Sequence, residues 1–434
     1  MRAAALAVPI VLALALQGCV PAGRLSDETT AEKGPVPGEA CVVIATDGAW
    51  SWFGGPRAVS VGGENPRTYV GWVTSGGDIR VGAFDHETGS VETALLHDDF
   101  QADDHANPTL LVDEEERLMA FYSGHRGRWT IYRQTLRPHD LEDWTRERAA
   151  GPFTNDVRGY TYPSPVQLES RGDSVLVFWR GPGYDAAFAA SGDDRHWTPG
   201  RTVLEGAGQL YFRVASDTAG AVHVAFNDGH PRTTSDNGVS YVRLHNGVFE
   251  RADGTPVAGL DELPVDPSRA DRVYDGSGPD GRSWLWDVAA DAAGRPVIVY
   301  AVFPSEDDHR YRYARWNGTS WDDHEITPAG RWFPDVPETS SRFEPYYSGG
   351  LCLDHGDPSV VYLSRPVDGV FEIERWTTED GGATWESTAV TAGSAMDNVR
   401  PVVPRNARPD GPRVIWMHGE YSDYLDYRTD LRAR

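Results

Sequence analysis

The sequence is short of positive charge. Its 434 residues contain 40 Lys and Arg against 65 Asp and Glu, which gives a formal net charge of −25 and a pI of about 4.8. A chain this acidic disfavours nucleic acid and anionic membrane surfaces as partners. A polyanionic ligand would therefore have to be met by a local basic site, because bulk electrostatic attraction does not provide one.

Long apolar runs are also missing. The one clear run, residues 3–16, is too short to cross a bilayer and has the layout of an export signal. The following Leu16-Gln17-Gly18-Cys19 resembles a bacterial lipobox, so we expect residues 1–19 to be a lipoprotein signal peptide and Cys19 to be lipidated. A plain signal with an incidental Cys19 is the alternative. Residues 20–38 are expected to form a flexible tether and residues 39–434 a single domain. The protein should then be exported and lipid-anchored at the bacterial cell surface or outer membrane, touching the membrane only through that anchor.

Cysteine is scarce, with three in the chain. Cys41 and Cys352 could pair in an exported protein, but two cysteines do not decide the question. Cys352 and His355 have the Cys-x-x-His spacing of metal ligands, which leaves a structural metal ion there open. A buried structural role is the favoured interpretation of that pair, and we expect no cofactor.

No helical period is visible after Cys41. Short alternating or β-branched runs recur instead between Gly, Asp, Asn and Pro clusters, as in RTYVGWVT, SVLVFWRG, AVHVAFND and PVIVYAVF. The 15 Trp, 18 Tyr and 14 Phe against 4 Met are typical of strands, and 46 Gly with 30 Pro indicate many turns. The fold class is therefore predicted to be all-β.

The runs group into seven units of similar length. Their predicted starts lie near Arg57, Pro108, Pro165, Tyr211, Trp286, Gly350 and Arg400. Four strands per repeat at this period indicate a seven-bladed β-propeller. The orphan strand in residues 40–48 is expected to pair with the last unit, which would close the ring and remove two exposed edges. We expect this propeller to be a monomer.

One turn motif punctuates several units. Residues 377–385, TTEDGGATW, match the pattern Ser/Thr-x-Asp-x-Gly-x-Thr-Trp, known as an Asp box, and residues 191–197, SGDDRHW, are a degenerate version. The Asp should cap a tight turn between strands while the Trp packs beneath it. These boxes are predicted to be structural and not catalytic.

Several stretches resemble a known family. They are DGAWSWFGGPRAV, DDHANPTLLV, MAFYSGHRG, TYPSPVQL, VFWRG, AFNDGHPR, YSGGLCLDHGDPSVVYLSR and FEIERWTTEDGGATW, spread in order over residues 47–385. Together they are similar to the BNR-repeat propellers that include ulvan lyases. The resemblance implies a polysaccharide lyase that cleaves a uronic-acid-containing, ulvan-like polysaccharide by β-elimination.

The chemistry that this resemblance implies needs three roles. A cation must neutralise the uronate carboxylate, a base must take the C5 proton, and an acid must protonate the leaving oxygen. The resemblance places the catalytic residues at His105, His125, Tyr162 and Arg180, with Arg180 on the carboxylate. It places substrate-binding positions at His230 and Tyr241, and Tyr160 is close enough to Tyr162 to be confused with it. Arg180 is expected to lower the pKa of the adjacent tyrosine.

The residues themselves support part of this interpretation. His105 and His125 flank a predicted hairpin within residues 103–127, so one mouth should hold both imidazoles. Solvent-facing loop positions for the histidines, a packing role for Tyr162 and a strand-end salt bridge for Arg180 are the alternatives. The sequence shows no cluster of Lys or Arg near the proposed site, so it gives no sign of sulfate recognition.

Two other functions are compatible with the same architecture. One is a sialidase-like or rhamnosidase-like glycoside hydrolase, although the sequence shows no arginine triad. The other is a non-catalytic, glycan-binding surface lipoprotein.

Overall fold

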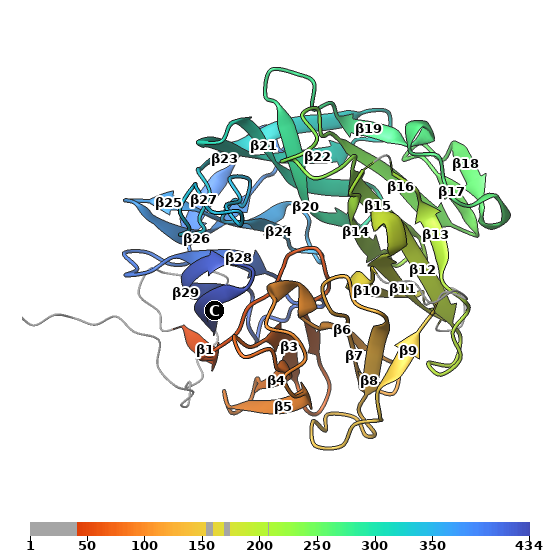
Figure 1. Cartoon of the computed structure of the whole chain (residues 1–434), viewed down its shortest axis with the longest axis vertical. Helices are drawn as coiled ribbons and strands as arrows, with labels where there is room; N and C mark the ends of the chain where they lie inside the picture. Colours follow the sequence, from red (N-terminus) through yellow and green to blue (C-terminus); the bar gives the residue numbers. More distant parts are fainter. Residues whose placement is uncertain (1–40, 153–158, 169–173, 207) are drawn as a thin grey trace, which may run out of the picture.

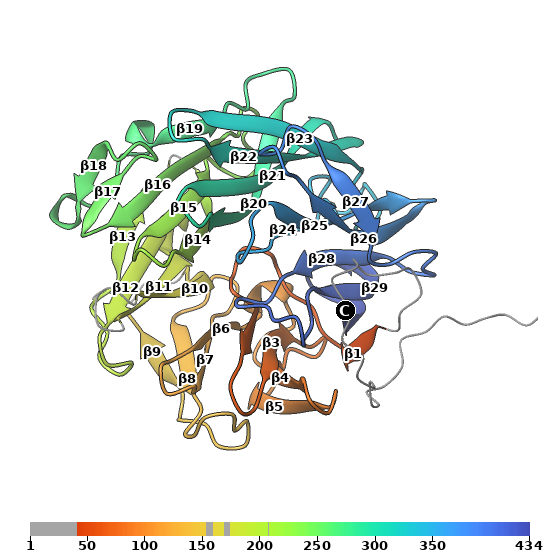
Figure 2. The same ribbon diagram turned by 180° about the vertical axis from the view of Figure 1, so that it is seen from behind.

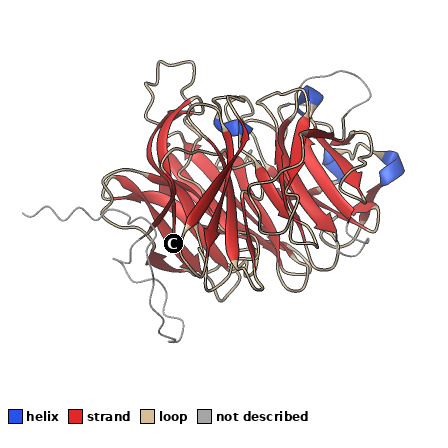
Figure 3. Ribbon diagram, turned by 90° about the horizontal axis from the view of Figure 1, so that it is seen from below, coloured by secondary structure: helices blue, strands red, loops and turns tan. Residues whose placement is uncertain are grey.

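The chain forms a ring of seven antiparallel sheets around a central axis (Figure 1). The computed structural model describes residues 41–152, 159–168, 174–206 and 208–434. Seen from the opposite side, the sheets are again arranged as blades around the same centre (Figure 2). Among the described residues, helix is confined to short 3-10 turns between strands (Figure 3). The prediction of an all-β, seven-bladed propeller is confirmed. The predicted signal peptide, Cys19 and the tether lie outside the described residues, and no helix within those residues is long and apolar enough to span a membrane.

In each blade the first four strands named are antiparallel neighbours that run from the axis outward. Blade one is β2 (Ala58–Val61), β3 (Arg67–Val73), β4 (Ile79–Asp85) and β5 (Val91–His97). Blade two is β6 (Thr109–Val112), β7 (Leu118–Tyr122), β8 (Thr130–Gln134) and β9 (Arg148–Ala150). Blade three is β10 (Thr161–Leu168), β11 (Ser174–Arg180), β12 (Ala186–Ser191) and β13 (Arg201–Leu204). Blade four is β14 (Tyr211–Ser216), β15 (Val222–Asn227), β16 (Val239–His245), β17 (Val248–Glu250), β18 (Pro256–Gly259) and β19 (Asp271–Tyr274). In blade four, β18 continues this order and β19 pairs with β16.

The remaining three blades have four strands each. Blade five is β20 (Arg282–Ala290), β21 (Pro296–Ser305), β22 (Asp308–Trp316) and β23 (Trp321–Gly330). Blade six is β24 (Leu351–Leu353), β25 (Val360–Val367), β26 (Val370–Thr377) and β27 (Glu386–Ala389). Blade seven is β28 (Asn398–Val402), β29 (Ile415–Asp423), β30 (Asp426–Ala433) and β1 (Val42–Ala45). The innermost strands therefore begin within a few residues of the seven predicted unit starts.

The ring closes through its two ends. Strand β1 pairs antiparallel with β30, with Val42 opposite Ala433 and Val43 opposite Arg432. This closure was predicted, and it removes the free edge that an open ring would present. It also draws the last blade against the first two, since Arg400 in β28 bonds to the Trp50 carbonyl ahead of β2.

The Asp box of residues 377–385 is a structural turn. One carboxylate oxygen of Asp380 accepts hydrogen bonds from the Thr378 hydroxyl and the Thr384 backbone N–H, both at 2.9 Å. The Trp385 indole donates to the Gly382 carbonyl and packs edge-on against Tyr313 of the neighbouring blade. The box thus fixes a turn and fastens it to the adjacent sheet.

The two ends of the central channel differ. At one end, the starts of the innermost strands, including Tyr211, surround a pocket. The ends of the same strands, among them Val61, Val112 and Ser216, line a cavity of about 1050 Å³. All innermost strands therefore run in one direction along the axis, and side chains just before them gather at one mouth.

Candidate active site

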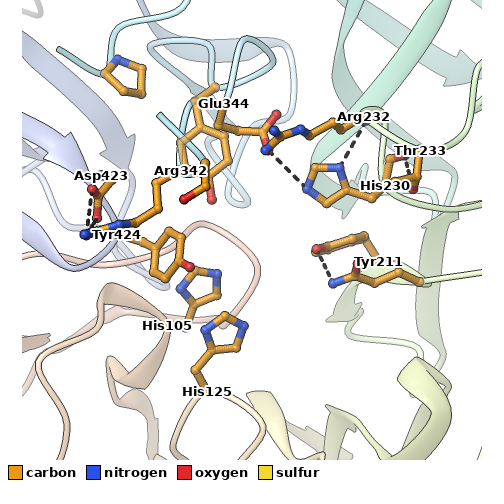
Figure 4. A pocket seen from close by; sticks show the side chains of 14 residues that line it. His105, His125, Tyr211, His230, Arg232, Thr233, Arg342, Glu344, Asp423 and Tyr424 are labelled. Atoms are coloured by element: carbon orange, nitrogen blue, oxygen red, sulfur yellow. Dashed lines mark hydrogen bonds and ion pairs between the residues drawn. The ribbon is translucent and has the colours of Figure 1, made fainter. Parts of the chain in front are cut away.

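A pocket of about 270 Å³ opens where the innermost strands begin (Figure 4). It is lined by His105, His125, Gln209, Tyr211, His230, Arg232, Thr233, Pro334, Ser341, Arg342, Glu344, Tyr347, Asp423 and Tyr424. These residues come from blades two and four, from the segment between β23 and β24, and from the β29–β30 turn. Three of the predicted site residues, all histidines, are among them.

His105 and His125 form a stacked pair. His105 belongs to the 3-10 turn η1 (Asp104–Ala106) ahead of β6, and His125 follows β7. Their rings lie 4.0 Å apart between centroids with an interplanar angle of 3°. Tyr424 meets both rings edge-on. The hairpin therefore does bring both imidazoles to one mouth.

One carboxylate holds both histidines. Asp103 accepts from His105 Nδ1 at 2.6 Å and from His125 Nδ1 at 2.9 Å, using one oxygen for each. Because Nδ1 of His125 donates, its Nε2 is the ring nitrogen left with a free lone pair. Burial and the neighbouring His105 lower the pKa of His125 below its usual 6.5, so its imidazole is neutral at pH 7 and can accept a proton.

His105 is in the opposite electrostatic state. Burial acts to lower its pKa, but the carboxylates of Asp103 and Asp104 outweigh burial and raise it to about 9. His105 Nδ1 lies 2.9 Å from an oxygen of Asp104. The pair therefore combines an imidazolium, His105, with a neutral imidazole, His125.

The last blade anchors this arrangement. Arg400 donates to the second oxygen of Asp104 at 2.5 Å, and the Tyr421 hydroxyl donates to the same oxygen at 2.6 Å. The Arg400 guanidinium is enclosed by Trp52, Tyr421 and two further rings at 4.6–5.4 Å. A buried ion pair with this many partners fixes Asp104, and through it His105, in one orientation.

Tyr162 and Arg180 lie beside the pocket, beneath its lining. Tyr162 has φ of 59°, a left-handed conformation that a tyrosine rarely adopts, at the point where the register of β10 shifts. Its ring lies 5.4 Å from that of His105. Burial raises the pKa of Tyr162 well above 10 despite the opposing charge of Arg180, so the expectation of a lowered pKa was wrong. Tyr162 is therefore a proton donor and not a base near neutral pH.

Arg180 is the least satisfied group in the site. It is 1% exposed, and within the described part of the chain none of its three guanidinium nitrogens has a hydrogen-bond partner of normal geometry. The guanidinium carbon instead lies over the rings of Tyr162, Tyr211 and Tyr184 at 4.7, 4.9 and 5.3 Å. Arg180 is therefore a buried cation among tyrosine rings, with the Tyr211 side chain close by and no carboxylate paired with it in the described residues.

The opposite wall of the pocket carries His230 and Glu344. His230 Nε2 lies 3.5 Å from a carboxylate oxygen of Glu344. Burial, with Arg180 next in effect, lowers the pKa of His230 to about 3, so this imidazole is neutral. Burial raises the pKa of Glu344 to about 7 against the opposing effect of Arg232. The sequence had placed His230 at a substrate-contacting position, and the structure puts it in the pocket wall.

Two predicted positions do not reach the pocket. Tyr241 is fully buried inside blade four, where its hydroxyl bonds His223 and its ring packs against Trp321. Tyr160 is also buried and stacks on Trp179. Both side chains pack within the fold, and neither is among the residues that line this pocket, where the sequence had led us to expect them. Of the two neighbouring tyrosines, Tyr162 is the one next to the histidines.

Cys352 and His355 are not part of a group of three or more ligand atoms close enough to share an ion in the described part of the chain. Cys352 is a buried free thiol, so it does not pair with Cys41. His355 Nε2 bonds a carboxylate oxygen of Asp287 at 3.0 Å. Asp103, His105 and His125 are the described residues whose ligand atoms lie close enough to share an ion, all within 4.8 Å. Those same Nδ1 atoms donate to Asp103, so a metal ion would have to displace both protons.

Several pocket residues escaped the sequence analysis. Tyr211 starts an innermost strand as Tyr162 does, and that shared place in the repeat could have identified it. Arg232 and Arg342 lie at the pocket although the sequence showed no basic cluster, because they are 110 positions apart in the chain. Glu344 lies in a segment between β23 and β24 that has no strand and no motif, so no sequence signal pointed to it.

Comparison with known proteins supports the propeller fold and identifies the family of the chain. Residues 67–329 match the model of the BNR repeat-containing family. A curated relative, an ulvan lyase of family PL25 from Pseudoalteromonas sp. (strain PLSV), is 21% identical over 311 residues, which are 59% of this chain and 61% of that protein. The chain thus matches less than two thirds of that relative's length.

Solved structures show the same architecture. A PL25 ulvan lyase bound to -[GlcA(1-4)Rha3S]- superposes with a TM-score of 0.67 at 17% identity, covering 90% of this chain and 94% of the other. The polysaccharide lyase Uly1 gives a TM-score of 0.53 at 12% identity, covering 90% and 96%. At these identities the likeness shows the shared fold. The family match spans more than half of the sequence, and the chain therefore belongs to the BNR repeat-containing family of β-propellers.

Proposed function

We propose that this protein is a polysaccharide lyase that cleaves a uronic-acid-containing, ulvan-like polysaccharide by β-elimination. The observation that carries the proposal is Arg180: a buried guanidinium without a hydrogen-bond partner among the described residues, placed beside a neutral histidine and a protonated tyrosine. The distant relationship to ulvan lyases supports the same reaction.

The first role is neutralisation of the uronate carboxylate by Arg180. The C5 proton of a uronate becomes removable only when the negative charge that develops on the carboxylate is stabilised. Guanidinium donors bind carboxylates in a bidentate manner, and no carboxylate of the described residues is paired with Arg180. The ring faces of Tyr162 and Tyr211 hold the cation in place until substrate arrives.

The second role is removal of the C5 proton by His125. Its Nδ1–H is held by Asp103, which orients the ring and leaves the Nε2 lone pair available to the pocket. His105, as the stacked imidazolium, keeps the pKa of His125 low. A low pKa keeps the base unprotonated at neutral pH, while Asp103 stabilises the imidazolium formed when the proton arrives.

The third role is protonation of the leaving O4 by Tyr162. This hydroxyl stays protonated near neutral pH and is next to both Arg180 and His105. As the C4–O4 bond breaks, O4 takes the phenolic proton, and the product is a 4,5-unsaturated uronate. The proton that His125 gains then leaves to solvent, and the Tyr162 phenolate takes a proton from solvent, so both groups return to their starting states.

The test is formation of the unsaturated product. Incubation with ulvan and with other polyuronates should produce the ultraviolet absorbance of an unsaturated uronate, and both Tyr162→Phe and His125→Ala should abolish it. New reducing ends without unsaturation would support a glycoside hydrolase instead. Binding without turnover, unchanged by His105→Ala, would support a non-catalytic glycan-binding protein.

The cellular setting is a separate proposal. We propose that residues 1–19 direct export and that Cys19 carries the lipid anchor, which would place the enzyme where extracellular polysaccharide reaches it. Labelling with a radioactive fatty acid in a bacterial host should mark the wild-type protein and not Cys19→Ser. Equal labelling of both proteins would overturn this assignment.

A further inference from the structure

A second cavity lies at the opposite end of the central channel from the proposed active site. Its volume is about 1050 Å³, and the ends of the innermost strands line it together with His355 and Arg405. None of its lining residues takes part in the proposed lyase reaction. A ligand bound here would therefore be independent of that reaction.

Arg405 is fixed at the channel wall by its backbone. Its N–H donates to the Ala58 carbonyl at 2.9 Å, and its carbonyl accepts from the Ser60 N–H at 2.8 Å. These bonds hold the segment after β28 against β2, the innermost strand of blade one. In this position the Arg405 side chain forms part of the cavity wall.

The Arg405 guanidinium forms no ion pair with a carboxylate of the described residues. Burial lowers its pKa to about 10, and Arg213 acts in the same direction, whereas Asp287 opposes them. The fall in pKa means that the protein around Arg405 disfavours the charged form. Arginine nonetheless keeps its proton in proteins, so a positive charge remains at the cavity wall without a matching negative charge.

Asp287 is the carboxylate with the largest effect on Arg405, and other groups already hold it. One of its oxygens accepts from Arg213 at 3.0 Å, and the other accepts from His355 Nε2 at 3.0 Å. Burial, with Arg405 next in effect, lowers the pKa of His355 to about 4, so this imidazole is neutral. Asp287 therefore neutralises Arg213 and leaves Arg405 without a counter-ion.

Arg57 adds a further buried cation to the same region. It is 6% exposed and donates to backbone carbonyls just ahead of it in the chain. Burial, with Arg213 next in effect, holds its pKa well below the usual range. Asp354, which also acts on Arg405, is paired with Arg413 at 3.6 Å. Among the described residues, this end of the channel thus carries more buried arginine than carboxylate charge.

We propose that this cavity binds a small monovalent anion, such as chloride, on the Arg405 guanidinium, and that the anion is the counter-ion of the buried arginines Arg57, Arg213 and Arg405. Guanidinium N–H groups are strong donors to anions. Their attraction for an anion is stronger in a partly buried site than in water. The anion supplies the negative charge that the described carboxylates do not.

The mouth of the cavity limits the charge that such an anion can carry. Asp113, Asp217 and Asp291 directly follow the innermost strands β6, β14 and β20, and all of them line the cavity. Each carboxylate is engaged by a residue of its own blade, but together they keep the mouth acidic. Repulsion grows in proportion to the charge of an approaching anion. Sulfate, phosphate and acidic polysaccharides are therefore disfavoured against a small monovalent anion.

Bromide can locate the site directly, because it is a monovalent anion with an anomalous X-ray signal. Crystals of the full-length protein soaked in sodium bromide should show an anomalous peak within hydrogen-bonding distance of the Arg405 guanidinium. The peak should be missing from Arg405→Met and retained in Arg408→Met. Arg408 is the matched control, since it lines the same cavity but is paired with Asp410 at 3.0 Å.

Unfolding in urea, which adds no chloride, measures what the anion does for the fold. The unfolding free energy of the wild type should rise by about 1.4 kcal/mol for each tenfold increase in chloride above the dissociation constant. Arg408→Met should keep this dependence and Arg405→Met should lose it. At the lowest chloride concentration Arg405→Met should be at least as stable as the wild type, because it lacks the unpaired buried charge.

Sodium sulfate at equal ionic strength separates the proposed site from a general salt effect. It should stabilise the wild type and Arg405→Met equally, and a rise confined to the wild type would overturn the assignment to a monovalent anion. Bromide peaks that avoid Arg405 or persist in Arg405→Met, or a chloride dependence shared by all three proteins, would overturn the site itself. If Arg405→Met does not fold, the wild-type bromide map decides alone.

Discussion

Arg180 and Arg400 offer a paired test of the proposed function. Both are buried arginines surrounded by aromatic rings near the axis, and both are 1% exposed. Arg400 is ion-paired with Asp104, whereas Arg180 has no hydrogen-bond partner in the described part of the chain. If Arg180 binds substrate, then Arg400→Met should mainly lower the stability of the fold, whereas Arg180→Met should mainly lower activity.

The magnitudes follow from what each substitution leaves behind. Arg400→Met breaks the buried ion pair with Asp104, and removal of one partner from such a pair costs about 3–5 kcal/mol of unfolding free energy. Asp104 keeps its ion pair with His105, so we expect a loss at the lower end of that range. Arg180→Met removes a buried charge that has no counter-ion, which offsets the loss of three ring contacts worth about 0.5–2 kcal/mol each. We therefore expect Arg180→Met to change the unfolding free energy by about 1 kcal/mol or less.

The activity of Arg180→Met should fall steeply although its stability changes little. Loss of the group that stabilises developing negative charge lowers kcat by about 100- to 1000-fold. Denaturant unfolding at pH 7 measures the stability of both variants, and release of unsaturated uronate from ulvan measures activity. If Arg180→Met destabilises the fold as much as Arg400→Met does, Arg180 is a structural residue and the central observation of the proposed function is refuted.

The remaining predictions concern charge in and around the pocket. Carboxylates raise the pKa of His105 from 6.5 to about 9, so its ion pairs stabilise the fold fully below pH 6.5 and lose that effect as the pH rises through about 9; denaturant midpoints should fall over this interval, and Asp103→Asn should flatten the fall. The pKa of His125 lies below 6.5, so kcat/KM should hold at pH 6.5 and decline only in more acidic buffer. Prolonged EDTA treatment should leave turnover unchanged, and a loss restored by zinc would place a metal at the histidines. Arg342→Ala should raise KM for ulvan at low salt, with little effect on kcat and a smaller effect in concentrated salt.

Much of the fold was readable from the sequence because its signals are local. Strand alternation, turn residues and the Asp box each act within a few positions, and the strand and turn signals recur in all seven units. The predicted starts near Arg57, Pro108 and Tyr211 therefore fall beside β2, β6 and β14. Closure by β1 followed from the cost of leaving two sheet edges open.

The site was only partly readable because its remaining signals are not local. A side chain next to an innermost strand can face the pocket or a neighbouring sheet, and the local backbone conformation decides which. Tyr160 and Tyr162 show this: the left-handed backbone at Tyr162 turns its ring toward the histidines, whereas the Tyr160 ring packs on Trp179. The tyrosine pKa was predicted with the wrong sign because the charge of Arg180 was visible in sequence and the depth of burial was not.

The chain is acidic overall, yet a buried cation, Arg180, lies beneath its pocket, and this contrast has a physical explanation. Long-range attraction cannot draw a polyanion to a protein with a net charge of −25, and salt screens such fields within about 10 Å. If Arg180 binds the uronate carboxylate as proposed, it acts at contact distance, and its cation is already desolvated by burial in the fold. Because the Arg180 guanidinium already loses its water when the protein folds, a carboxylate that binds it forms the ion pair without a further desolvation cost for the arginine. Acidic groups on the protein surface would then repel polyanions that have no carboxylate able to reach Arg180. Selectivity would come from the contact with this guanidinium and not from surface charge.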